Sequence, residues 1–208
     1  MSYPNAVYVP LAAAIKQAVP EIPIFHATRI VDPVHADQIL ADGSIDVVGM
    51  TRALIADPDM PRKAREGRLD EIRQCVGANE GCIDRIYQGK PVTCIQNPGA
   101  GREAELGGDL VPAATRKRIV VVGGGVSGLE TARVAALRGH RVVLFEKGRE
   151  LGGQVLVAAR TPARADYAGI VRFLVRQVER QGVDCRMSVE ADVDAVLAHP
   201  RFGKALER

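Results

Sequence analysis

The feature that most constrains this chain is the glycine-rich run GGGVSG at residues 123–128. It follows the apolar segment IVVVG, which is typical of a buried strand, and it opens a segment with helical character. In this setting Gly123 permits a tight turn, Gly125 lets the backbone approach a pyrophosphate at the helix N-terminus, and Gly128 lets helix and strand pack closely. The run therefore predicts a parallel α/β unit that binds a dinucleotide, with Val126 and Ser127 in the first helical turn beside the phosphates.

An acidic residue and a second glycine turn support this prediction. Glu146 ends the next apolar strand, RVVLFE, where its carboxylate can accept hydrogen bonds from ribose hydroxyls. The same charge would repel a 2′-phosphate, so this half of the site is not expected to hold NADP. The turn ELGGQ follows, and we include Lys147, Gly153 and Gln154 among the candidate cofactor contacts. The alternative is a glycine turn between strand and helix that binds nothing.

The composition argues against several other classes of protein. Of the 208 residues 47% are hydrophobic and 25% are charged, and no apolar run approaches the roughly 20 residues that a membrane span needs. The N-terminus shows no basic leader, apolar core and small-residue cleavage site in succession, so we expect a cytoplasmic protein. With a net charge of +3, four Phe, four Tyr and no Trp, the chain gives little sign of a nucleic-acid stacking surface. We therefore expect neither a membrane nor a nucleic-acid partner.

The sequence pattern divides the chain into three parts. Residues 1–70 alternate helical segments with short apolar strands, which predicts a parallel sheet buried on both faces. Residues 71–115 hold three cysteines and many glycines and prolines, and we expect an irregular connector there. Residues 116–208 carry the dinucleotide motif, a long amphipathic helix over Ala165–Gln181 and a third strand within VDCRMSV, and we expect an incomplete doubly wound sheet. That helix would carry Ile170, Phe173, Leu174 and Val178 on one side. The elements expected in the first part span residues 11–18, 22–25, 34–40, 45–49 and 62–66. The helix over 34–40 would start at Asp32-Pro33 and end at Asp42-Gly43.

Three of the four cysteines lie close together in the sequence. Cys75 and Cys82 bound the segment CVGANEGC, and Cys94 follows after eleven residues. In a reducing compartment clustered cysteines are more often metal or catalytic groups than disulfides. Three thiolates in a glycine-containing loop can bind an iron–sulfur cluster, although a cubane cluster normally has four protein ligands. Zinc with a further ligand and three buried apolar cysteines are the alternatives.

Two resemblances extend these inferences. The order FEKGRELGGQ is similar to that of two-dinucleotide-binding flavoproteins, in which the acid binds ribose and the LGGQ turn runs beside the flavin-side phosphates, and this favours FAD or ADP over NAD. The whole chain resembles the trimethylamine dehydrogenase and bacterial 2,4-dienoyl-CoA reductase family of NADH:flavin oxidoreductases. The likeness is carried by GMTRALIADPDMPRKAREGRLDEIRQC, CIDRIYQGKPVTCIQNP and VVVGGGVSGLETARVAALRGHRVVLFEKGRELGGQ. It implies an FMN-binding (β/α)8 barrel of Old Yellow Enzyme type, joined through a 4Fe–4S loop to an FAD/NAD(P)-binding domain.

By this resemblance the first part of the chain is the C-terminal end of the barrel. The last two barrel strands with their following loops would be Ile22–Ile30 and Ile45–Arg52, and such loops commonly form the phosphate site of a barrel. Arg52 would contact the FMN phosphate directly, since its guanidinium can form a bidentate charge-assisted pair. Without the resemblance, Arg52 would be interpreted as a solvent-facing charge at a helix end. The candidate FMN contacts are Thr28, Arg29, Gly49, Met50, Thr51 and Arg52, and the candidate metal ligands are Cys75, Cys82 and Cys94.

Three features depart from the family pattern. Ala78 stands where the pattern has its second cysteine, so we expect a labile cluster, a 3Fe–4S cluster, or one completed by another group. Thr28 replaces a glycine that is common before the arginine of the first phosphate loop. By the resemblance the chain begins near the sixth barrel unit and ends inside the dinucleotide domain, so we expect a fragment without a substrate pocket and without turnover in isolation. No catalytic residue is assigned. Surface or packing roles are expected for His26, His35, His140 and His199.

The predicted fold is therefore α/β: the end of a (β/α)8 barrel, a cysteine-rich connector and an incomplete Rossmann-like domain. The predicted function is flavin- and iron–sulfur-dependent transfer of hydride and electrons between NAD(P)H or a small-molecule substrate and FMN or FAD. Related activities are those of 2,4-dienoyl-CoA reductases and of amine dehydrogenases or N-demethylases. One alternative is a truncated, inactive nucleotide-binding fragment that pairs its exposed sheet edges with a missing barrel segment or with further copies. Another is a nucleotide-binding regulatory module.

Overall fold

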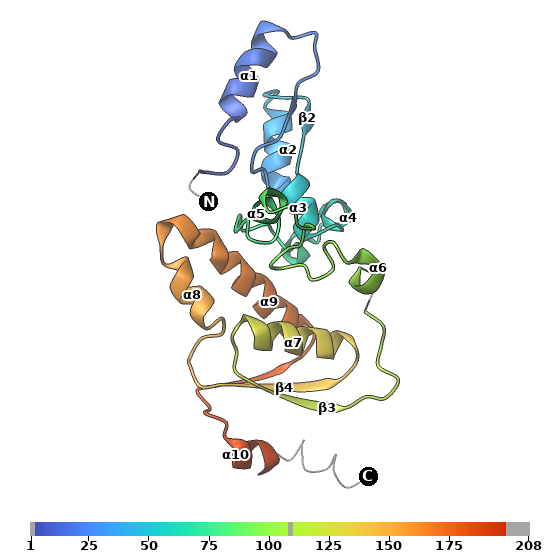
Figure 1. Ribbon diagram of the computed structural model, residues 1–208, viewed down its shortest axis with the longest axis vertical. Helices are drawn as coiled ribbons and strands as arrows, with labels where there is room; N and C mark the ends of the chain where they lie inside the picture. Colours follow the sequence, from blue (N-terminus) through green and yellow to red (C-terminus); the bar gives the residue numbers. More distant parts are fainter. Residues whose placement is uncertain (1–2, 108–109, 199–208) are drawn as a thin grey trace. The chain divides into compact units, whose positions relative to one another are not determined.

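The computed structural model describes residues 3–107 and 110–198, and the chain forms two compact units, Met1–Gly108 and Asp109–Arg208 (Figure 1). Each unit combines helices with short parallel strands, as the α/β prediction requires. The first unit contains α1 (Val9–Ala18), β1 (Phe25–His26), α2 (Pro33–Ala41), β2 (Val47–Val48), α3 (Thr51–Ala56), α4 (Met60–Arg65), the 3-10 helix η1 (Leu69–Glu71), α5 (Ile83–Tyr87) and α6 (Glu103–Leu106). The second unit contains β3 (Arg118–Val122), α7 (Val126–Leu137), β4 (Arg141–Glu146), α8 (Gln154–Ala159), the 3-10 helix η2 (Pro162–Tyr167), α9 (Ala168–Arg180), β5 (Asp184–Met187) and α10 (Val193–Ala198).

In the first unit, β1 and β2 pair in parallel and α2 connects them. Phe25 lies opposite Val47 in the register. The α2 helix begins where the sequence predicts, because the Asp32 carboxylate caps it by accepting the Val34 backbone N–H at 2.9 Å. It ends before Gly43, whose φ of +67° suits the left-handed turn that follows. The strand–helix–strand order is therefore confirmed, although both strands are only two residues long.

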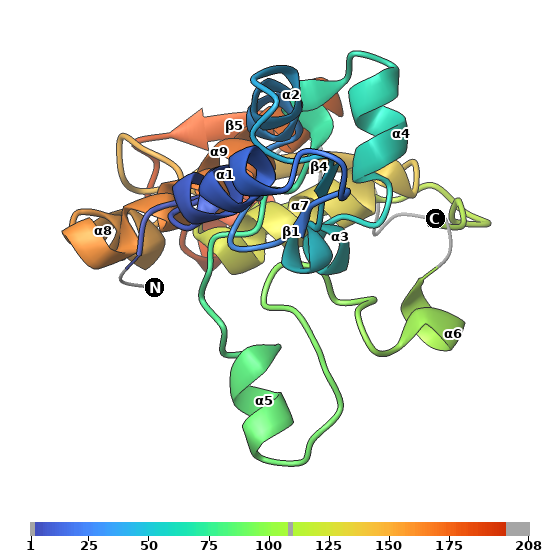
Figure 2. The same ribbon diagram turned by 90° about the horizontal axis from the view of Figure 1, so that it is seen from above.

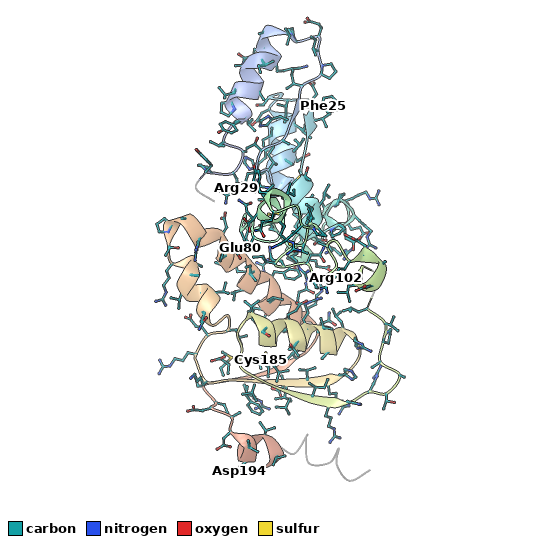
Figure 3. All side chains as sticks on the ribbon, in the orientation of Figure 1. Phe25, Arg29, Glu80, Arg102, Cys185 and Asp194 are labelled. Carbon is teal, nitrogen blue, oxygen red and sulfur yellow. The ribbon has the colours of Figure 1, made fainter. Side chains whose placement is uncertain are left out.

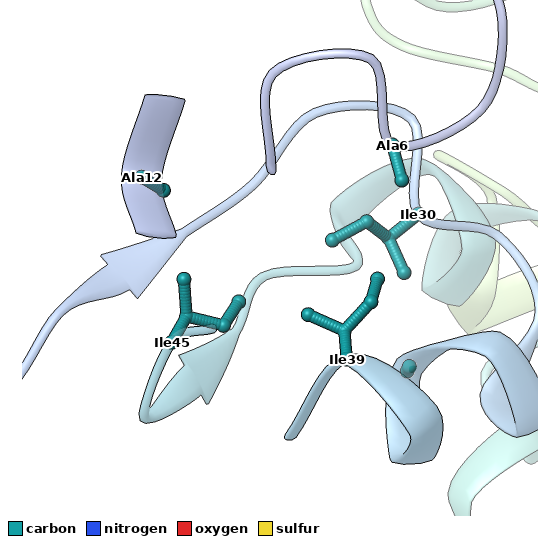
Figure 4. Close-up of a cluster of buried hydrophobic side chains, with 6 residues drawn as sticks. Ala6, Ala12, Ile30, Ile39 and Ile45 are labelled. Atoms are coloured by element: carbon teal, nitrogen blue, oxygen red, sulfur yellow. The ribbon is translucent and has the colours of Figure 1, made fainter. Parts of the chain in front are cut away.

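A small hydrophobic core lies on one side of these strands. Ile30, Ile39 and Ile45 are almost fully buried and pack together with Ala6 and Ala12 (Figure 4). Burial of such aliphatic side chains contributes roughly 1.5–3 kcal/mol each to folding. This core fixes the position of β1 and β2, and with it the segments that follow each strand.

The opposite side of the strand pair is open. Phe25 is 72% exposed and projects from β1 (Figure 3), and its neighbour Val47 is 40% exposed. The sequence predicted a sheet buried on both faces, and within the described residues this prediction is wrong for these two strands. The physical reason is that the hydrophobic core of this unit covers only the face that carries Ile24 and Val48.

A second cluster joins α3 and α4 to the start of the connector. Val31, Ala53, Met60 and Ile72 form it. Beside it the Asp57 carboxylate, 4% exposed, accepts hydrogen bonds from Lys63 Nζ at 2.6 Å and from the backbone N–H of Arg73 at 2.9 Å. A buried carboxylate needs such partners, because desolvation without them is costly. The cysteine-containing segment is thus anchored to the helices that follow β2.

The connector holds two helices that the sequence did not predict, α5 and α6. They have only five and four residues, too few to produce a periodic pattern. Figure 2 shows α5 at the far end of a loop that leaves α3 and α4. The loop is closed by Gly81, whose carbonyl accepts the Thr93 N–H at 2.6 Å; an added Cβ would lie 2.9 Å from the Thr93 carbonyl oxygen. The backbone around Thr93 approaches Gly81 so closely that this position requires glycine.

The second unit is a three-stranded parallel sheet in the order β3-β4-β5. The residues 142–145 of β4 are all buried, as expected for the central strand. Helix α7 lies along β3 and β4 (Figure 1) and packs against α9. The predicted third strand is β5, and the predicted amphipathic helix is α9, which begins at Ala168 because residues 162–167 form η2 instead. In the described part of the chain, no helix is long and apolar enough to cross a membrane.

Candidate functional site

The glycine run forms the turn between β3 and α7, and its three motif glycines have different surroundings. Gly123 has a φ of +98°, in the left-handed region that favours glycine. A Cβ added to Gly128 would lie 1.9 Å from the Gly123 carbonyl oxygen, so the first turn of α7 can approach the loop only without a side chain. Gly123 and Gly128 are therefore glycines for reasons internal to the fold.

Gly125 differs from both. Its φ of −69° and ψ of 175° are open to any residue, and an added Cβ would have no atom of the chain within 4 Å. Neither backbone strain nor packing accounts for glycine here. The free space lies at the N-terminus of the twelve-residue helix α7, where backbone N–H groups and the helix dipole favour an anion. Val126 and Ser127 begin that helix, and the Ser127 side chain is exposed.

Glu146 closes the loop from the end of β4. Its two carboxylate oxygens accept the backbone N–H groups of Gly124 and Gly148, each at 2.6 Å. The bonds from Gly148 and then from Gly124 lower the pKa of this carboxyl below its ordinary value, so it is charged at neutral pH. A carboxylate oxygen has further lone pairs, and Glu146 can therefore accept ligand hydroxyls while it holds the loop.

The second glycine turn lies directly against the first. Gly152 donates its N–H to the Gly124 carbonyl at 2.8 Å and forms a parallel bridge with Gly125. Gly153 has a φ of +54°, and an added Cβ would lie 3.2 Å from the Cα atom of Gly125. The two turns therefore form one continuous surface of backbone, with the exposed side chain of Gln154 beside it at the start of α8. Lys147, next to Glu146, is also exposed.

Gly124 is a residue of this site that the sequence analysis missed. Its N–H binds Glu146 and its carbonyl binds Gly152. A Cβ there would lie 2.4 Å from Leu151 Cδ2 and 3.1 Å from Glu146 Cβ. The signal was present in the sequence, because the motif requires glycine at its first and third positions but leaves the second open. Three consecutive glycines therefore marked an additional close contact.

In the first unit, the residues that follow β1 and β2 lie side by side. The Gly49 N–H donates to the His26 carbonyl at 2.8 Å, and an added Cβ at Gly49 would lie 2.7 Å from Ala27 Cβ. Arg29 has a φ of +49°, and its guanidinium donates to the Tyr3 carbonyl. The hydroxyl of Thr28 donates to the Ala27 carbonyl. The two candidate phosphate segments thus meet at the carboxyl ends of two adjacent parallel strands.

The prediction that 49–52 is a loop needs correction. Thr51 and Arg52 form the first turn of α3, and only Gly49 and Met50 precede it. The helix forms because Ala53 and Ala56 are buried on one side of it and Met50 packs against both hydrophobic clusters of this unit. Six residues are too short a run for its periodicity to have been recognised in the sequence.

Arg52 is half-buried and connects α3 to the cysteine segment. Its Nη1 donates to Asn79 Oδ1 at 2.9 Å. Asn79 lies between Cys75 and Cys82, twenty-seven residues away in the chain. Sequence reasoning missed this contact, since nothing local to either residue indicates it.

The three clustered cysteines are half-buried free thiols in the same region. Burial raises the pKa of the Cys75 thiol, and the charges of Cys94 and Cys82 act in the same direction, while the Gly77 N–H and Arg52 oppose the shift. Cys82 and Cys94 thus lie near enough to Cys75 to influence its pKa. Backbone N–H groups of Gly77 and Gln96 lie 3.4 Å from the sulfur atoms of Cys75 and Cys94.

These thiols match the donor chemistry of an iron–sulfur cluster only in part. Soft thiolates with N–H···S contacts are the ligands that such clusters take. Ala78 supplies no fourth donor, and within residues 3–107 and 110–198 no three His, Cys, Asp or Glu side chains are already arranged as a metal site. The three thiols therefore supply the donor chemistry of such a cluster, but the described residues do not gather them into a preformed metal site.

The described histidines lie in separate parts of the chain. His26 Nε2 is buried without a hydrogen-bond partner within the described chain, His35 is half-buried on α2, and His140 Nδ1 accepts the Lys117 N–H at 3.1 Å. His199 lies outside the described residues.

Each of the two units contains a segment that matches the profile of a known family of proteins or domains. Residues 6–71 match the profile of the NADH:flavin oxidoreductase / NADH oxidase family, and residues 121–177 match that of an NAD(P)-binding Rossmann-like domain. The chain is 43% identical to a metal reductase of Desulforamulus reducens, over 98% of this chain and 30% of the relative. It is 47% identical to an N,N-dimethylglycine/sarcosine dehydrogenase of Chromohalobacter salexigens, over 97% and 29% of the two chains.

Solved structures agree with these matches. A 2-naphthoyl-CoA reductase superposes with a TM-score of 0.90 at 35% identity, over 94% of this chain and 30% of that one. A histamine dehydrogenase from Rhizobium sp. 4-9 superposes with a TM-score of 0.86 at 27% identity, over 93% and 28%. The chain spans about 30% of the length of the relatives it matches. Its first unit thus matches the NADH:flavin oxidoreductase family and its second a Rossmann-like NAD(P)-binding domain, and over nearly its whole length the chain is similar to part of these larger flavin oxidoreductases.

Proposed function

We propose that this chain supplies the FMN-phosphate contacts, the cysteine segment and the adenine-dinucleotide site of a flavin- and iron–sulfur-dependent oxidoreductase. The observation that carries the proposal is the paired glycine turns of the second unit, in which Gly152 binds Gly124 and Glu146 holds the loop at its other edge. Such a backbone surface at a helix N-terminus suits a pyrophosphate.

The adenine-dinucleotide site is built by three groups of this chain. The N-terminus of α7 at Gly125 would receive the pyrophosphate, because the space over this residue is free of side chains. Glu146 would accept the adenosine ribose hydroxyls through lone pairs that Gly124 and Gly148 do not use. The second turn at Gly153 and Gln154 would flank the phosphates on the flavin side. The same geometry serves FAD or ADP, and the charge of Glu146 disfavours a 2′-phosphate.

The FMN site of the first unit is proposed at the segments after β1 and β2. Arg52 would pair with the phosphate, since it is a fixed positive charge whose position the Asn79 contact constrains. Gly49 and Met50 would offer backbone at the turn, and Thr28 would offer a hydroxyl. Arg29 would contribute long-range positive charge, because its guanidinium already donates to the Tyr3 carbonyl.

The cysteine segment is proposed to ligate an iron–sulfur cluster through Cys75, Cys82 and Cys94. When bound, the flavins supply hydride chemistry and a cluster supplies single-electron transfer. The residues of this chain hold these groups: the N–H groups of Gly77 and Gln96 face sulfur, and Arg52 provides a nearby positive charge. Burial of the thiols limits contact of the bound group with water.

Two substrate classes are proposed, and they are supported by the names of relatives and not by this chain's residues. Relatives named for N,N-dimethylglycine, sarcosine and histamine support a small amine, and 2-naphthoyl-CoA reductase supports an unsaturated acyl thioester. A nicotinamide cofactor is the proposed hydride partner, supported by the NADH:flavin oxidoreductase profile.

Cofactor analysis of the full-length gene product tests the proposal. After anaerobic purification, acid-released flavins are identified by chromatography, and iron and sulfide are quantified. We expect FMN, a second adenine-containing nucleotide (FAD or ADP), and iron with sulfide. Adenine nucleotide without FMN or iron would instead favour a nucleotide-binding regulatory module, and absence of all three would favour an inactive fragment.

A further inference from the structure

Helix α3 and the residue after it contact the cysteine segment, by which we mean the connector from residue 71 to residue 97, at three points. Arg52 Nη1 binds Asn79 Oδ1 at 2.9 Å, and the Ile55 carbonyl accepts Asn97 Nδ2 at 2.9 Å. Past the end of the helix, the Asp57 carboxylate accepts the Arg73 N–H. Of these contacts only the first involves a residue proposed to bind a cofactor.

Asn79 has two structural roles that can be separated. Its backbone has a φ of +68°, and its carbonyl accepts the N–H groups of Cys82 and Asp84 at 3.0 and 3.2 Å, so it forms the turn between the first two cysteines. Asparagine tolerates this left-handed conformation better than most residues. Its side chain, by contrast, leaves the turn and binds the Arg52 guanidinium. The carboxamide therefore serves the contact with Arg52 and not the turn.

We propose that Asn79 is a positioning residue for Arg52, and that through this contact the cysteine segment controls how tightly the FMN phosphate is held. This inference rests on the proposed role of Arg52. A guanidinium has five N–H donors in a rigid fork, so a bond from one of them to Asn79 orients the whole fork. Coupling between the two segments is reciprocal: what orders the cysteine segment tightens FMN, and FMN orders the cysteine segment.

The test compares FMN with riboflavin, which lacks the phosphate, in the full-length gene product stripped of flavin. Fluorescence quenching gives both dissociation constants. Arg52→Ala should weaken FMN roughly ten- to a hundredfold and leave riboflavin unchanged, because a bond to a charged group is lost. Asn79→Gly removes the carboxamide at a φ that glycine adopts without strain, and it should weaken FMN alone by roughly three- to tenfold. In an Arg52→Ala background the Asn79→Gly change should have no further effect.

Ser188→Gly is the matched control. Ser188 also has a positive φ, +57°, but it lies in the second unit, far along the chain from Arg52. Its replacement by glycine therefore tests the effect of removing a non-glycine side chain at a positive φ without touching the Arg52 contact. It should leave both dissociation constants unchanged. If Arg52→Ala does not separate FMN from riboflavin, the proposed function of Arg52 and this inference both fail. If Arg52→Ala does so but Asn79→Gly does not, or if Asn79→Gly acts equally in the Arg52→Ala background, only the inference is overturned.

Discussion

Gly125 and Gly128 lie three residues apart, yet the structure predicts opposite consequences when each is replaced by alanine. At Gly125 the new methyl group meets no atom of the chain within 4 Å, and the backbone dihedrals suit alanine. A compatible Gly→Ala change stabilises by about 0.4–1 kcal/mol through the unfolded state, and loss of a glycine N-cap costs a similar amount. The free energy of unfolding should therefore change by less than about 1 kcal/mol.

Binding should respond in the opposite sense. The methyl group of Gly125→Ala would fill the space over the N-terminus of α7 that the pyrophosphate needs. Each lost backbone bond to a charged phosphate costs about 1.5–3 kcal/mol, so the affinity for ADP and FAD should fall by at least roughly tenfold. Gly128→Ala is different, because its methyl group would lie 1.9 Å from the Gly123 carbonyl oxygen and the backbone itself must move. Overpacking of this kind costs about 1–3 kcal/mol or more, which lowers Tm by roughly 5–20 °C for a unit of this size.

Thermal melts by circular dichroism and calorimetric titration with ADP and FAD measure both quantities. We expect the Gly125→Ala variant to melt like the parent but to bind ADP and FAD at least roughly tenfold more weakly, and the Gly128→Ala variant to melt early. If Gly125→Ala binds both nucleotides with parental affinity, the space over this residue is not a ligand site. If Gly125→Ala melts as early as Gly128→Ala, the distinction between the two glycines fails as well.

Three further predictions follow from other contacts. The pKa of Glu146 is lowered in the folded chain, so its contribution to stability is complete above the ordinary carboxyl pKa of 4.5 and is lost as the pH falls through the lower folded value. Glu146→Gln should therefore flatten the acid limb of a plot of Tm against pH, and an unchanged limb would contradict the assignment. Ala78→Cys should raise the iron bound after anaerobic reconstitution from about three to about four per chain and make the iron harder to remove by chelator, because a cubane cluster takes four thiolates. Equal iron in both proteins would reject the proposed register of the cysteine ligands. Asp57→Asn should destabilise the first unit by about 1–3 kcal/mol in urea unfolding, because Lys63 loses a carboxylate partner at 2.6 Å in a largely buried setting. A change in the free energy of unfolding within experimental error would show that the ion pair contributes nothing.

The second unit could be predicted from sequence because its signals are local. The glycine spacing, the apolar runs of β3 and β4 and the periodicity of α9 each lie within a short window. Ile170, Phe173, Leu174 and Val178 were expected on one side of a helix, and all four are buried. The turn at Gly43 and the cap at Asp32 were equally legible, because caps and turns depend on single residue types.

The first unit and the connector were harder to predict, for two physical reasons. Helices of four to six residues, such as α3, α5 and α6, are too short for their periodicity to emerge above chance. Contacts between distant residues leave no local trace: Arg52 and Asn79 are separated by twenty-seven positions, and Gly124 meets Gly152 only after the sheet has formed. Exposure of Phe25 was also missed, since an apolar run predicts burial without specifying what covers each face.

The central proposal is that the full-length protein binds a flavin, a cysteine-ligated cluster and an adenine dinucleotide, and that electrons pass from NADH through flavin to the cluster. An anaerobic reductive titration of the reconstituted full-length gene product with NADH, followed by absorbance and electron paramagnetic resonance, tests it most directly. We expect NADH to abolish the absorbance of oxidised flavin and to produce a paramagnetic iron–sulfur signal. The signal should disappear when Cys75, Cys82 or Cys94 is replaced by serine. Retention of the flavin spectrum in excess NADH, or a signal unaffected by those replacements, would contradict the proposal.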